Sequence, residues 1–316
     1  MGYNLPITGI CSFGKYPIVT DLDTVKADVA VLGIPCDIAV GFLSGSRLGP
    51  RRIREASTQY ARGDAGFYDP ERDETYLAAP WKIVDCGDCG IVTGDIDATL
   101  ASAEKCVRKL ADSGAIPVIM GGDHSVSVPV ASGIAGLGSA HVIQLDAHLD
   151  WSRGVGAQRY TNGTPMRHIS QMNHVTGMTQ IGMRGFGSST KADYAEARAW
   201  GSDIITGREA RKLGAEGLLE RVPPGRNYYV TIDMDALDMC QAPGLASPVP
   251  GGLDFSLLAD LLEGICRRGK VVCFDLVEVA PQYDPTGATP RMAALIMLHF
   301  MGFILKEREK EKNERH

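Results

Sequence analysis

The 316-residue sequence lacks the features of secreted, membrane-spanning and multi-domain proteins. Its first residues contain no basic segment followed by an apolar core, so a signal peptide is not expected. The most apolar late stretch, residues 292–305, is too short to cross a membrane and is interpreted as a buried helix. There is no internal repeat, low-complexity linker or composition break. These absences favour a single cytoplasmic domain over residues 1–316.

A disulfide framework is also absent, although the chain has eight cysteines. Their spacing is irregular, and several lie in apolar runs, so they are interpreted as reduced core residues. Cys86 and Cys89 have the spacing of a redox or zinc half-site, but no second pair or suitably spaced His accompanies them. We therefore favour a structural role for both. The net charge of -6 argues against nucleic acid and anionic membranes as partners.

Apolar strand-like runs alternate with helical patterns along most of the chain. Strands are expected at residues 28–35, 81–86, 116–120, 142–145, 178–181, 202–205, 228–232 and 271–276, and helices at 51–59, 97–113, 254–268 and near the C-terminus. Residues 1–25 look like an irregular arm, and residues 306–316 like a solvated or frayed charged tail. Because the strands are almost continuously apolar, the pattern predicts an α/β fold, a three-layer α/β/α sandwich with a mostly parallel sheet.

Three short blocks of metal-ligand residues each follow an apolar run. The ligands in them are His124, then Asp146, His148 and Asp150, and finally Asp233 and Asp235. Alternate side chains of an extended segment point to one side, and facing acidic segments repel each other unless cations neutralise them. In a parallel sheet, ligands bind at the carboxyl ends of the strands. The blocks therefore predict a two-metal centre, and ordinary turn caps are the weaker interpretation.

The chemistry of the ligands restricts the choice of metal ion only in part. The set has no Cys, which excludes a structural zinc site. Carboxylates can bridge two cations, so six residues can serve two ions. Mixed His and carboxylate ligands suit Mn²⁺ and also admit Ni²⁺, Co²⁺ or Zn²⁺, and the sequence does not choose among them.

The motifs Gly-Gly-Asp-His-Ser, Asp-Ala-His-x-Asp and Asp-x-Asp-Ala-Leu-Asp occur in this order. In that order they resemble the signature of the arginase/agmatinase family, the ureohydrolases. Residues 45–54, 248–253 and 278–285 also resemble family segments, closest to the agmatinase branch. The resemblance implies an arginase/deacetylase-like fold and two divalent ions, Mn²⁺ by family with Ni²⁺ as the alternative. It further implies a homo-oligomer, either a trimer or a hexamer, with a homologous second subunit left open.

The resemblance also implies roles for individual residues. One ion would be held by His124, Asp146, Asp150 and Asp233, and the other by Asp146, His148, Asp233 and Asp235, so that Asp146 and Asp233 bridge. The ions would activate water for attack on a guanidinium carbon, and Asp150 would relay a proton to the departing amine. Glu278 would bind the planar guanidinium, with a surface or ion-pair role as the alternative.

The chain departs from the family pattern beside the second block. Asn162 replaces a His that is thought to shuttle protons in most relatives. An Asn side chain can donate and accept hydrogen bonds, but it cannot act as a general acid or base. His168 is either its substitute or a plain loop residue, and we favour the loop residue. Trp151 either packs internally or offers a cation–π wall to a substituted guanidinium. Arg153 and Arg159 would repel a second cation in the substrate unless they face solvent.

These observations predict a hydrolase that splits a guanidino-type C–N bond and releases urea from a small substrate other than agmatine. Its catalytic residues would be Asp150, Glu278 and Asn162, and its pocket residues Trp151, Arg159 and His168. The substrate stays open between a guanidino acid, guanidine, and an alkyl-guanidine or biguanide such as metformin. One alternative is a formiminoglutamase-like hydrolase, because that related branch also lacks the His. Another is a metal-binding, non-catalytic partner subunit of a hetero-oligomeric ureohydrolase.

Overall fold

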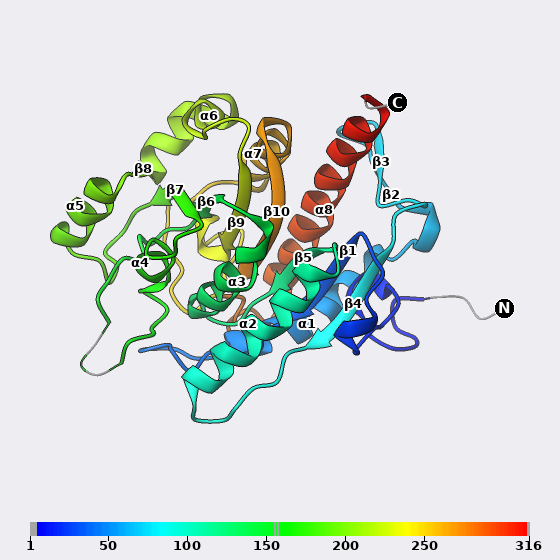
Figure 1. The fold of residues 1–316 in the computed structure, drawn as a ribbon, viewed down its shortest axis with the longest axis horizontal. Helices are drawn as coiled ribbons and strands as arrows, with labels where there is room; N and C mark the ends of the chain where they lie inside the picture. The colour runs from blue at the N-terminus through cyan, green and yellow to red at the C-terminus, as the bar shows by residue number, and fades with distance from the viewer. Residues whose placement is uncertain (1–4, 155, 157, 315–316) are drawn as a thin grey trace.

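The computed structural model describes residues 5–154, 156 and 158–314, and an eight-stranded parallel sheet forms its centre (Figure 1). The strands lie in the order β4-β1-β5-β10-β9-β6-β7-β8. Their bounds are β1 Val29–Gly33, β4 Ile83–Asp88, β5 Ile116–Met120, β6 Ala140–Leu145, β7 Val175–Met183, β8 Ser202–Thr206, β9 Asn227–Asp233 and β10 Lys270–Val277. Every pair of neighbouring strands in this sheet is parallel, as the apolar runs predicted.

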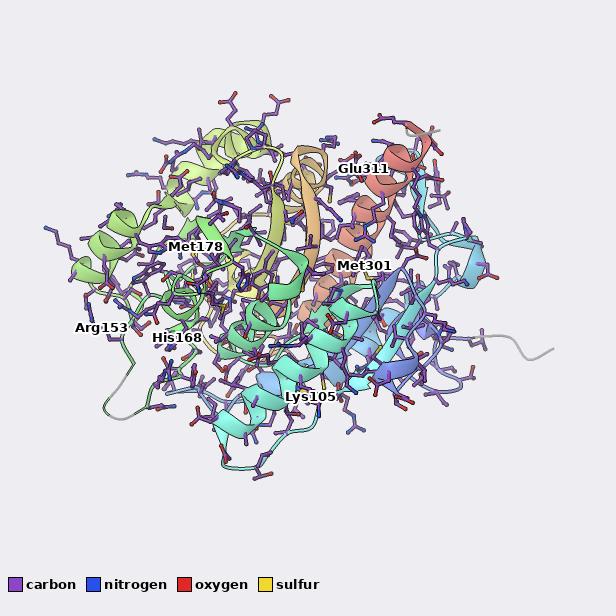
Figure 2. All side chains as sticks on the ribbon, in the orientation of Figure 1. Lys105, Arg153, His168, Met178, Met301 and Glu311 are labelled. Atoms are coloured by element: carbon purple, nitrogen blue, oxygen red, sulfur yellow. The ribbon has the colours of Figure 1, made fainter. Side chains whose placement is uncertain are left out.

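Helices cover both faces of the sheet and form two separate cores with it. One face carries α1 Gly49–Ser57, α6 Gly207–Arg221, α7 Phe255–Arg268 and α8 Ala288–Glu314, and the other carries α2 Ile96–Asp112, α3 Ser127–Gly133, α4 Pro165–Ile169 and α5 Lys191–Trp200. Figure 2 labels Met301 in the first core and Met178 in the second, with Lys105 and Glu311 on the outer surface. The three-layer α/β/α sandwich is therefore confirmed.

Local sequence signals explain the helices that were predicted. In α2, the Asp95 side chain caps the helix by accepting the N–H of Ala98. Leu100, Ala103 and Val107 of α2 then recur on the face that packs against the sheet. Helices α5 and α6 were not predicted. Helix α5 buries few side chains, and α6 is interrupted at Gly214, whose φ is 64°, so neither shows a clear helical period.

Helix α8 is long and apolar enough to cross a membrane by length and composition alone. However, 72% of its most apolar window is buried, because α8 packs against α1 and α7. The helix continues to Glu314, so the tail is helical up to that residue instead of frayed. Lys312 lies 4.7 Å from the ring centroid of Trp81, which attaches the tail to the body of the protein. Residues 315–316 of the predicted tail lie outside the described residues.

The N-terminal arm is irregular but attached to the sheet. Phe13 is fully buried, and its N–H donates to Asp85 Oδ2 at 2.7 Å. Ile18 forms an isolated parallel bridge with Asp85. Residues 1–4 of the arm lie outside the described part of the chain. A two-stranded antiparallel hairpin, β2 Phe67–Asp69 and β3 Glu74–Tyr76, packs against α8 and was not predicted.

Candidate metal centre

Four neighbouring strands bring the predicted ligands to one edge of the sheet. His124 follows β5, Glu278 follows β10, Asp233 ends β9, and Asp146 follows β6. These strands are adjacent in the order β5-β10-β9-β6 and run parallel, so their carboxyl ends meet. His148, Asp150 and Asp235 lie just beyond the same strand ends, and all six predicted ligands come together there.

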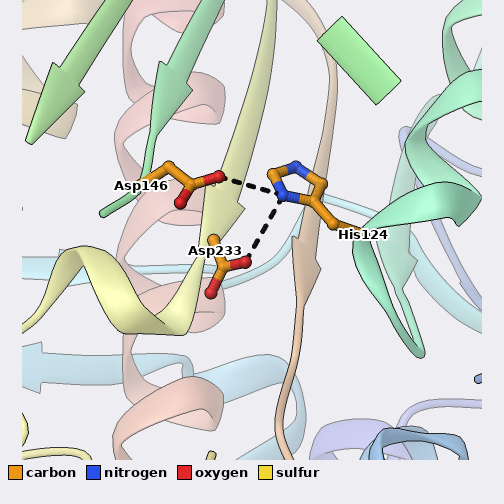
Figure 3. Close-up of side chains that lie close together, drawn as sticks. All are labelled: His124, Asp146 and Asp233. Carbon is orange, nitrogen blue, oxygen red and sulfur yellow. Dashed lines mark ion pairs between the residues drawn. The ribbon is translucent and has the colours of Figure 1, made fainter. Parts of the chain in front are cut away.

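His124 lies among three carboxylates, and Figure 3 shows two of them, Asp146 and Asp233. Its Nδ1 is 3.0 Å from Asp146 Oδ2, 2.9 Å from Asp150 Oδ2 and 3.3 Å from Asp233 Oδ2. Its Nε2 is 2.9 Å from Thr231 Oγ1, whereas the buried Nδ1 has no hydrogen-bond partner of good geometry. Since three anionic oxygens converge on this nitrogen, a proton or a metal ion must occupy the space between them. The donor atoms fit a divalent cation.

Asp146 connects this group to a second one. His148 Nδ1 lies 2.9 Å from Asp235 Oδ2 and 3.6 Å from Asp146 Oδ1. The two oxygens of Asp146 therefore face two different histidines, which is the arrangement expected of a bridging carboxylate. Two groups can each hold an ion: His124 with Asp146 and Asp233, and Asp146 with His148 and Asp235. Asp233 Oδ1 accepts the Asp235 N–H at 2.8 Å, and a bridging role for Asp233 stays a prediction.

The electrostatics of the cluster also favour bound cations. Burial, followed by repulsion from Asp150 and Asp235, raises the pKa of Asp146 well above its usual range. Burial and Asp235 raise the pKa of Asp233 to about 7. Burial lowers the pKa of His148, but Asp235 and Asp146 outweigh it and raise that pKa to about 11. The cluster thus retains protons that metal ions would displace, and its residues fit a pair of divalent ions.

A chain of glutamines positions Asp146 and was not anticipated from the sequence. Gln144 Nε2 donates to Asp146 Oδ2 at 2.6 Å and to the His148 carbonyl at 3.2 Å. Gln180 Nε2 donates to Gln144 Oε1 at 2.6 Å, and the Ser202 hydroxyl donates to Gln180 Oε1 at 2.6 Å. Such hydrogen-bond partners hold a metal ligand in its orientation. The signal in the sequence was a single Gln inside each of two buried, apolar strands.

Asp123 was present in the first block but was not counted as a site residue. Its Oδ2 accepts the N–H of Ala39 at 3.0 Å, and its Oδ1 accepts the N–H of Ser125 at 2.9 Å. The carbonyl of Ala39 in turn accepts the N–H of Asn162 at 3.3 Å. Asp123 therefore holds the two loops that bring Asn162 to the site.

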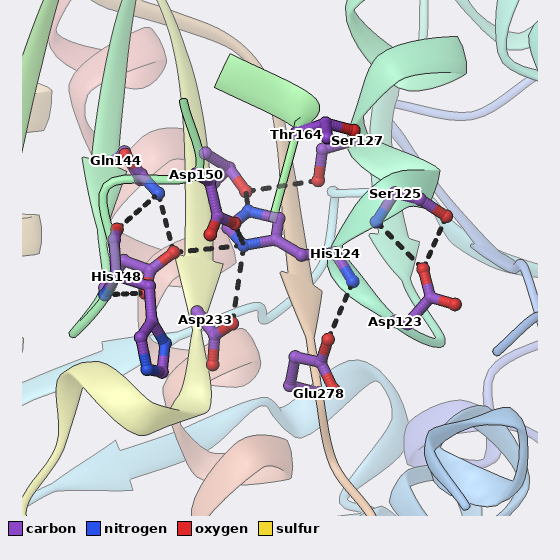
Figure 4. Close-up of polar contacts among 12 residues, drawn as sticks. Asp123, His124, Ser125, Ser127, Gln144, His148, Asp150, Thr164, Asp233 and Glu278 are labelled. Carbon is purple, nitrogen blue, oxygen red and sulfur yellow. Dashed lines mark hydrogen bonds and ion pairs between the residues drawn. The ribbon is translucent and has the colours of Figure 1, made fainter. Parts of the chain in front are cut away.

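Two of the predicted catalytic residues have a backbone conformation that is rare outside glycine. Asp150 has a φ of 53° and Glu278 a φ of 68°. Glu278 donates its N–H to the Gly122 carbonyl at 2.8 Å, and its Oε1 accepts the His124 N–H at 2.9 Å (Figure 4). The Asp150 carbonyl accepts the N–H of Met166 at 3.1 Å. Strained backbone held by its surroundings is typical of functional sites.

A cavity of about 330 Å³ opens above the cluster. Its lining consists of His148, Asp150, Asn162, Gly163, Phe186, Gly187, Ser188, Asp233, Asp235, Leu245, Ser247, Pro248, Val249 and Glu278. Asn162 and Glu278 thus lie where a substrate would bind. Phe186, Leu245, Ser247, Pro248 and Val249 were not predicted as site residues, although Pro248 and Val249 begin the segment 248–253 that resembles the family.

The three predicted pocket residues do not line this cavity. Trp151 is 2% exposed and packs against Trp200 at 5.8 Å between ring centroids, so it is a packing residue in this structure. Arg159 and His168 line a separate groove between α2, α3 and α4, where His168 Nε2 lies 3.0 Å from the Arg159 carbonyl. Figure 2 shows His168 on the α4 side of the molecule. Arg159 precedes α4 and His168 lies within α4 itself, so His168 is a helix residue and not the loop residue that was expected.

Arg153 also lies away from the cavity, since it is an exposed residue that pairs with Glu196 at 2.7 Å. Arg153 and Arg159 are both exposed and do not line the cavity, which supports the alternative that they face solvent. Val155 and Ala157 of this loop lie outside the described residues. Cys86 and Cys89 are free and buried, and burial raises the pKa of each thiol to about 12. Both are packing residues, as predicted.

Comparison with known proteins agrees with this geometry. The chain is 29% identical to the mitochondrial guanidino acid hydrolase of Homo sapiens, over 93% of this chain and 82% of the relative. It is 32% identical to the agmatinase of Bacillus anthracis, over 89% of this chain and 93% of the relative. The structure of proclavaminate amidino hydrolase from Streptomyces clavuligerus superposes with a TM-score of 0.87 and 29% identity, over 96% of this chain and 99% of that one. The model of the arginase family matches residues 27–302, and the chain therefore belongs to the arginase family.

Proposed function

We propose that this protein hydrolyses a guanidino-type C–N bond with two divalent metal ions and releases urea and an amine. Arginase-family amidinohydrolases act on the C–N bonds of guanidino compounds. The observation that supports the two-metal proposal is the placement of Asp146. Its two oxygens face two different histidines, and one of these, His148, lines the same cavity as Glu278.

The proposed reaction adds the oxygen of water to the guanidinium carbon and breaks one C–N bond. A bound pair of divalent ions supplies a nucleophilic water at neutral pH and stabilises developing charge. The carboxylate of Glu278, which is buried and lines the cavity, binds and orients the planar guanidinium. Asp150 carries the proton to the departing amine. Asn162 orients the substrate through hydrogen bonds, since its amide cannot transfer protons.

The identity of the metal ions, the cellular location and the oligomeric state are also proposed. We propose Mn²⁺ as the native ion, with Ni²⁺ as the alternative that His and carboxylate ligands also accept. A cytoplasmic homo-oligomer, either a trimer or a hexamer, is expected from the family resemblance, with a homologous second subunit as a further option. Elemental analysis and light scattering of the purified protein test these points.

The substrate is proposed to be a small guanidino compound other than agmatine. Asn162 lines the cavity in place of the His of most relatives, which supports a departure from them. The same replacement keeps a formiminoglutamase-like activity as the second candidate. We carry the pocket roles of Trp151, Arg159 and His168 no further, because the cavity lies elsewhere.

Urea release by the metal-loaded chain, purified alone, tests the proposed function. A panel of guanidino compounds and formiminoglutamate separates the two hydrolases, because the second would release formamide instead of urea. We expect two metal ions per chain and urea as the product. Two bound ions with no turnover on the whole panel would instead support a non-catalytic partner subunit.

A further inference from the structure

The cavity above the metal cluster has charged groups at its floor and none on its wall. The ionisable lining residues, which we call the floor, are Glu278 and four members of the metal cluster, His148, Asp150, Asp233 and Asp235. The wall comprises residues 162–163, 186–188, 245 and 247–249. These wall residues offer amide, hydroxyl, backbone and apolar surface but, among the residues described, no acid, Lys, Arg or His. A guanidinium can meet acids at the floor, whereas its substituent meets only uncharged surface.

The guanidinium of Arg184, which lies next to the wall, already donates hydrogen bonds to backbone carbonyls. Arg184 lies two residues before the wall segment 186–188, and its Nη2 donates to the carbonyls of Asp235 at 2.6 Å and Val249 at 2.7 Å. Its Nε donates to the Pro250 carbonyl at 3.1 Å. The guanidinium therefore joins two wall segments and is not directed at a substrate. A substrate carboxylate would find no counter-ion there.

Phe186 supplies an apolar contact at the mouth of the cavity. Its side chain is fully exposed, with a relative accessibility of 109%, although it lines the cavity. It lies between Gly185, with a φ of +67°, and Gly187. A Cβ added at Gly187 would lie only 2.8 Å from Cδ2 of His148, so this loop passes directly over the metal cluster. An aromatic ring at this position is stabilised by covering an apolar substituent.

We propose that the cavity selects guanidines that are unsubstituted or carry a compact, uncharged substituent, and that Phe186 is the contact for that substituent. This inference rests on the proposed function, of which it narrows the substrate class. A terminal ammonium or carboxylate would lose water against a wall that offers no opposite charge, which is costly. Burial of an alkyl group in the same place is favourable, because the group carries no charge that would lose its water. The inference excludes agmatine and the guanidino acids as preferred substrates.

Three substrates of similar length isolate the effect of terminal charge. N-butylguanidine ends in a methyl group, agmatine in an ammonium and 4-guanidinobutyrate in a carboxylate. We expect kcat/KM for urea release from N-butylguanidine to exceed that of both others by at least about tenfold. Guanidine and N,N-dimethylguanidine should also be turned over. A value for agmatine or 4-guanidinobutyrate equal to or above that of N-butylguanidine would overturn the inference and leave the proposed hydrolysis intact.

Calorimetric binding to the metal-loaded protein separates the two hypotheses. If no compound releases urea but N-butylguanidine still binds at least about tenfold more tightly than the charged pair, the selectivity stands and the proposed hydrolysis fails. If nothing binds and nothing is turned over, both fail.

Two sets of variants test the wall directly. Phe186→Ala should raise KM for N-butylguanidine by about tenfold and leave guanidine, which has no substituent, nearly unchanged. Phe42→Ala is the matched control, since Phe42 is 83% exposed but does not line the cavity. Ser247→Asp should raise kcat/KM for agmatine relative to N-butylguanidine by about tenfold, and Ser247→Lys should do the same for 4-guanidinobutyrate. Ser247→Asn controls for size, and equal ratios in all three Ser247 variants would contradict the inference.

Discussion

Acidic clusters at two places in the same sheet contain buried carboxylates that are neutralised in different ways. In edge strand β4, Asp85 accepts hydrogen bonds from Arg54 Nε at 2.8 Å and Nη2 at 3.0 Å. Asp85 also accepts the N–H of Phe13 at 2.7 Å and that of Gly87 at 2.9 Å. Burial alone would lower the pKa of Arg54, but Asp85 and Asp88 outweigh it and raise that pKa. This cluster contains its own cation.

The cluster at the ends of β6 and β9 has no such partner. Within the described residues, the ion-pair partners of Asp146, Asp150, Asp233 and Asp235 are two histidines only. The comparison shows how two groups of buried acids can be told apart. Acids that face a built-in guanidinium stabilise the fold, whereas acids that converge without one form a site for added cations.

Removal of Asp146, the proposed bridging carboxylate, is expected to have the largest effect. Asp146→Ala should abolish metal loading and lower activity by more than about 100-fold, the upper end for loss of a residue that merely orients a ligand. The metal-free variant should be no less stable than the metal-free parent, because a source of repulsion is gone. Elemental analysis, urea release and urea denaturation measure the three effects. A variant that keeps two ions and normal turnover would refute the assignment of Asp146.

Removal of Asp85 should have the opposite effects, which are a loss of stability and an unchanged metal content. Asp85→Ala leaves Arg54 buried without its partner, and we expect the free energy of unfolding to fall by about 3–5 kcal/mol. The metal content of the folded protein should stay the same. The double variant Arg54→Met/Asp85→Leu is the control, since replacing both charges should recover part of the loss. If Asp85→Ala lost metal but not stability, the distinction between the two clusters would be wrong.

Metal removal should destabilise the parent protein through the second cluster only. A ligand that binds the folded state at 100 times its dissociation constant contributes about 2.7 kcal/mol of stability. Dialysis against a chelator should therefore lower the melting temperature, and added Mn²⁺ should restore it. In Asp146→Ala the chelator should have no effect, whereas Asp85→Ala should respond like the parent. Calorimetry of the three proteins checks this.

A smaller effect of pH is expected at Asp284, before helix α8. Burial raises the pKa of Asp284, but hydrogen bonds from Thr286 and Thr289 outweigh it and lower that pKa below 3.8. The carboxylate therefore stabilises the fold fully above its unfolded-state pKa, and this contribution is lost as the pH falls through the lower, folded-state value. Asp284→Asn should lower stability at neutral pH and flatten its dependence on pH below about 4. Urea denaturation from pH 3 to 7 tests it, and an unchanged slope would count against this role.

The sequence predicted the sheet well because its strands are apolar on both faces. The segments 116–120 and 202–205 reappear as β5 and β8 to within one residue. The arm is irregular and residues 309–314 of the tail are exposed, as predicted, but the sequence did not predict the contacts of the arm or the helix of the tail. Phe13 is buried, and α8 extends to Glu314. Their conformations depend on partners distant in the sequence, such as Asp85 and Trp81, which no local pattern reveals.

The sequence by itself determined where the metal ligands lie, but it did not determine the wall of the cavity. Each ligand block is short and directly follows a buried strand, so its side chains lie at the sheet edge whatever path the following loop takes. The wall depended on tertiary structure. Trp151 follows the block directly but points into the core, because Asp150 has a φ of 53° and Arg167 Nε donates to the Trp151 carbonyl at 2.9 Å. Phe186 reaches the cavity only because its loop crosses His148. Strand ends are positioned by local apolar patterns, whereas loop side chains are positioned by long-range contacts that those patterns do not contain.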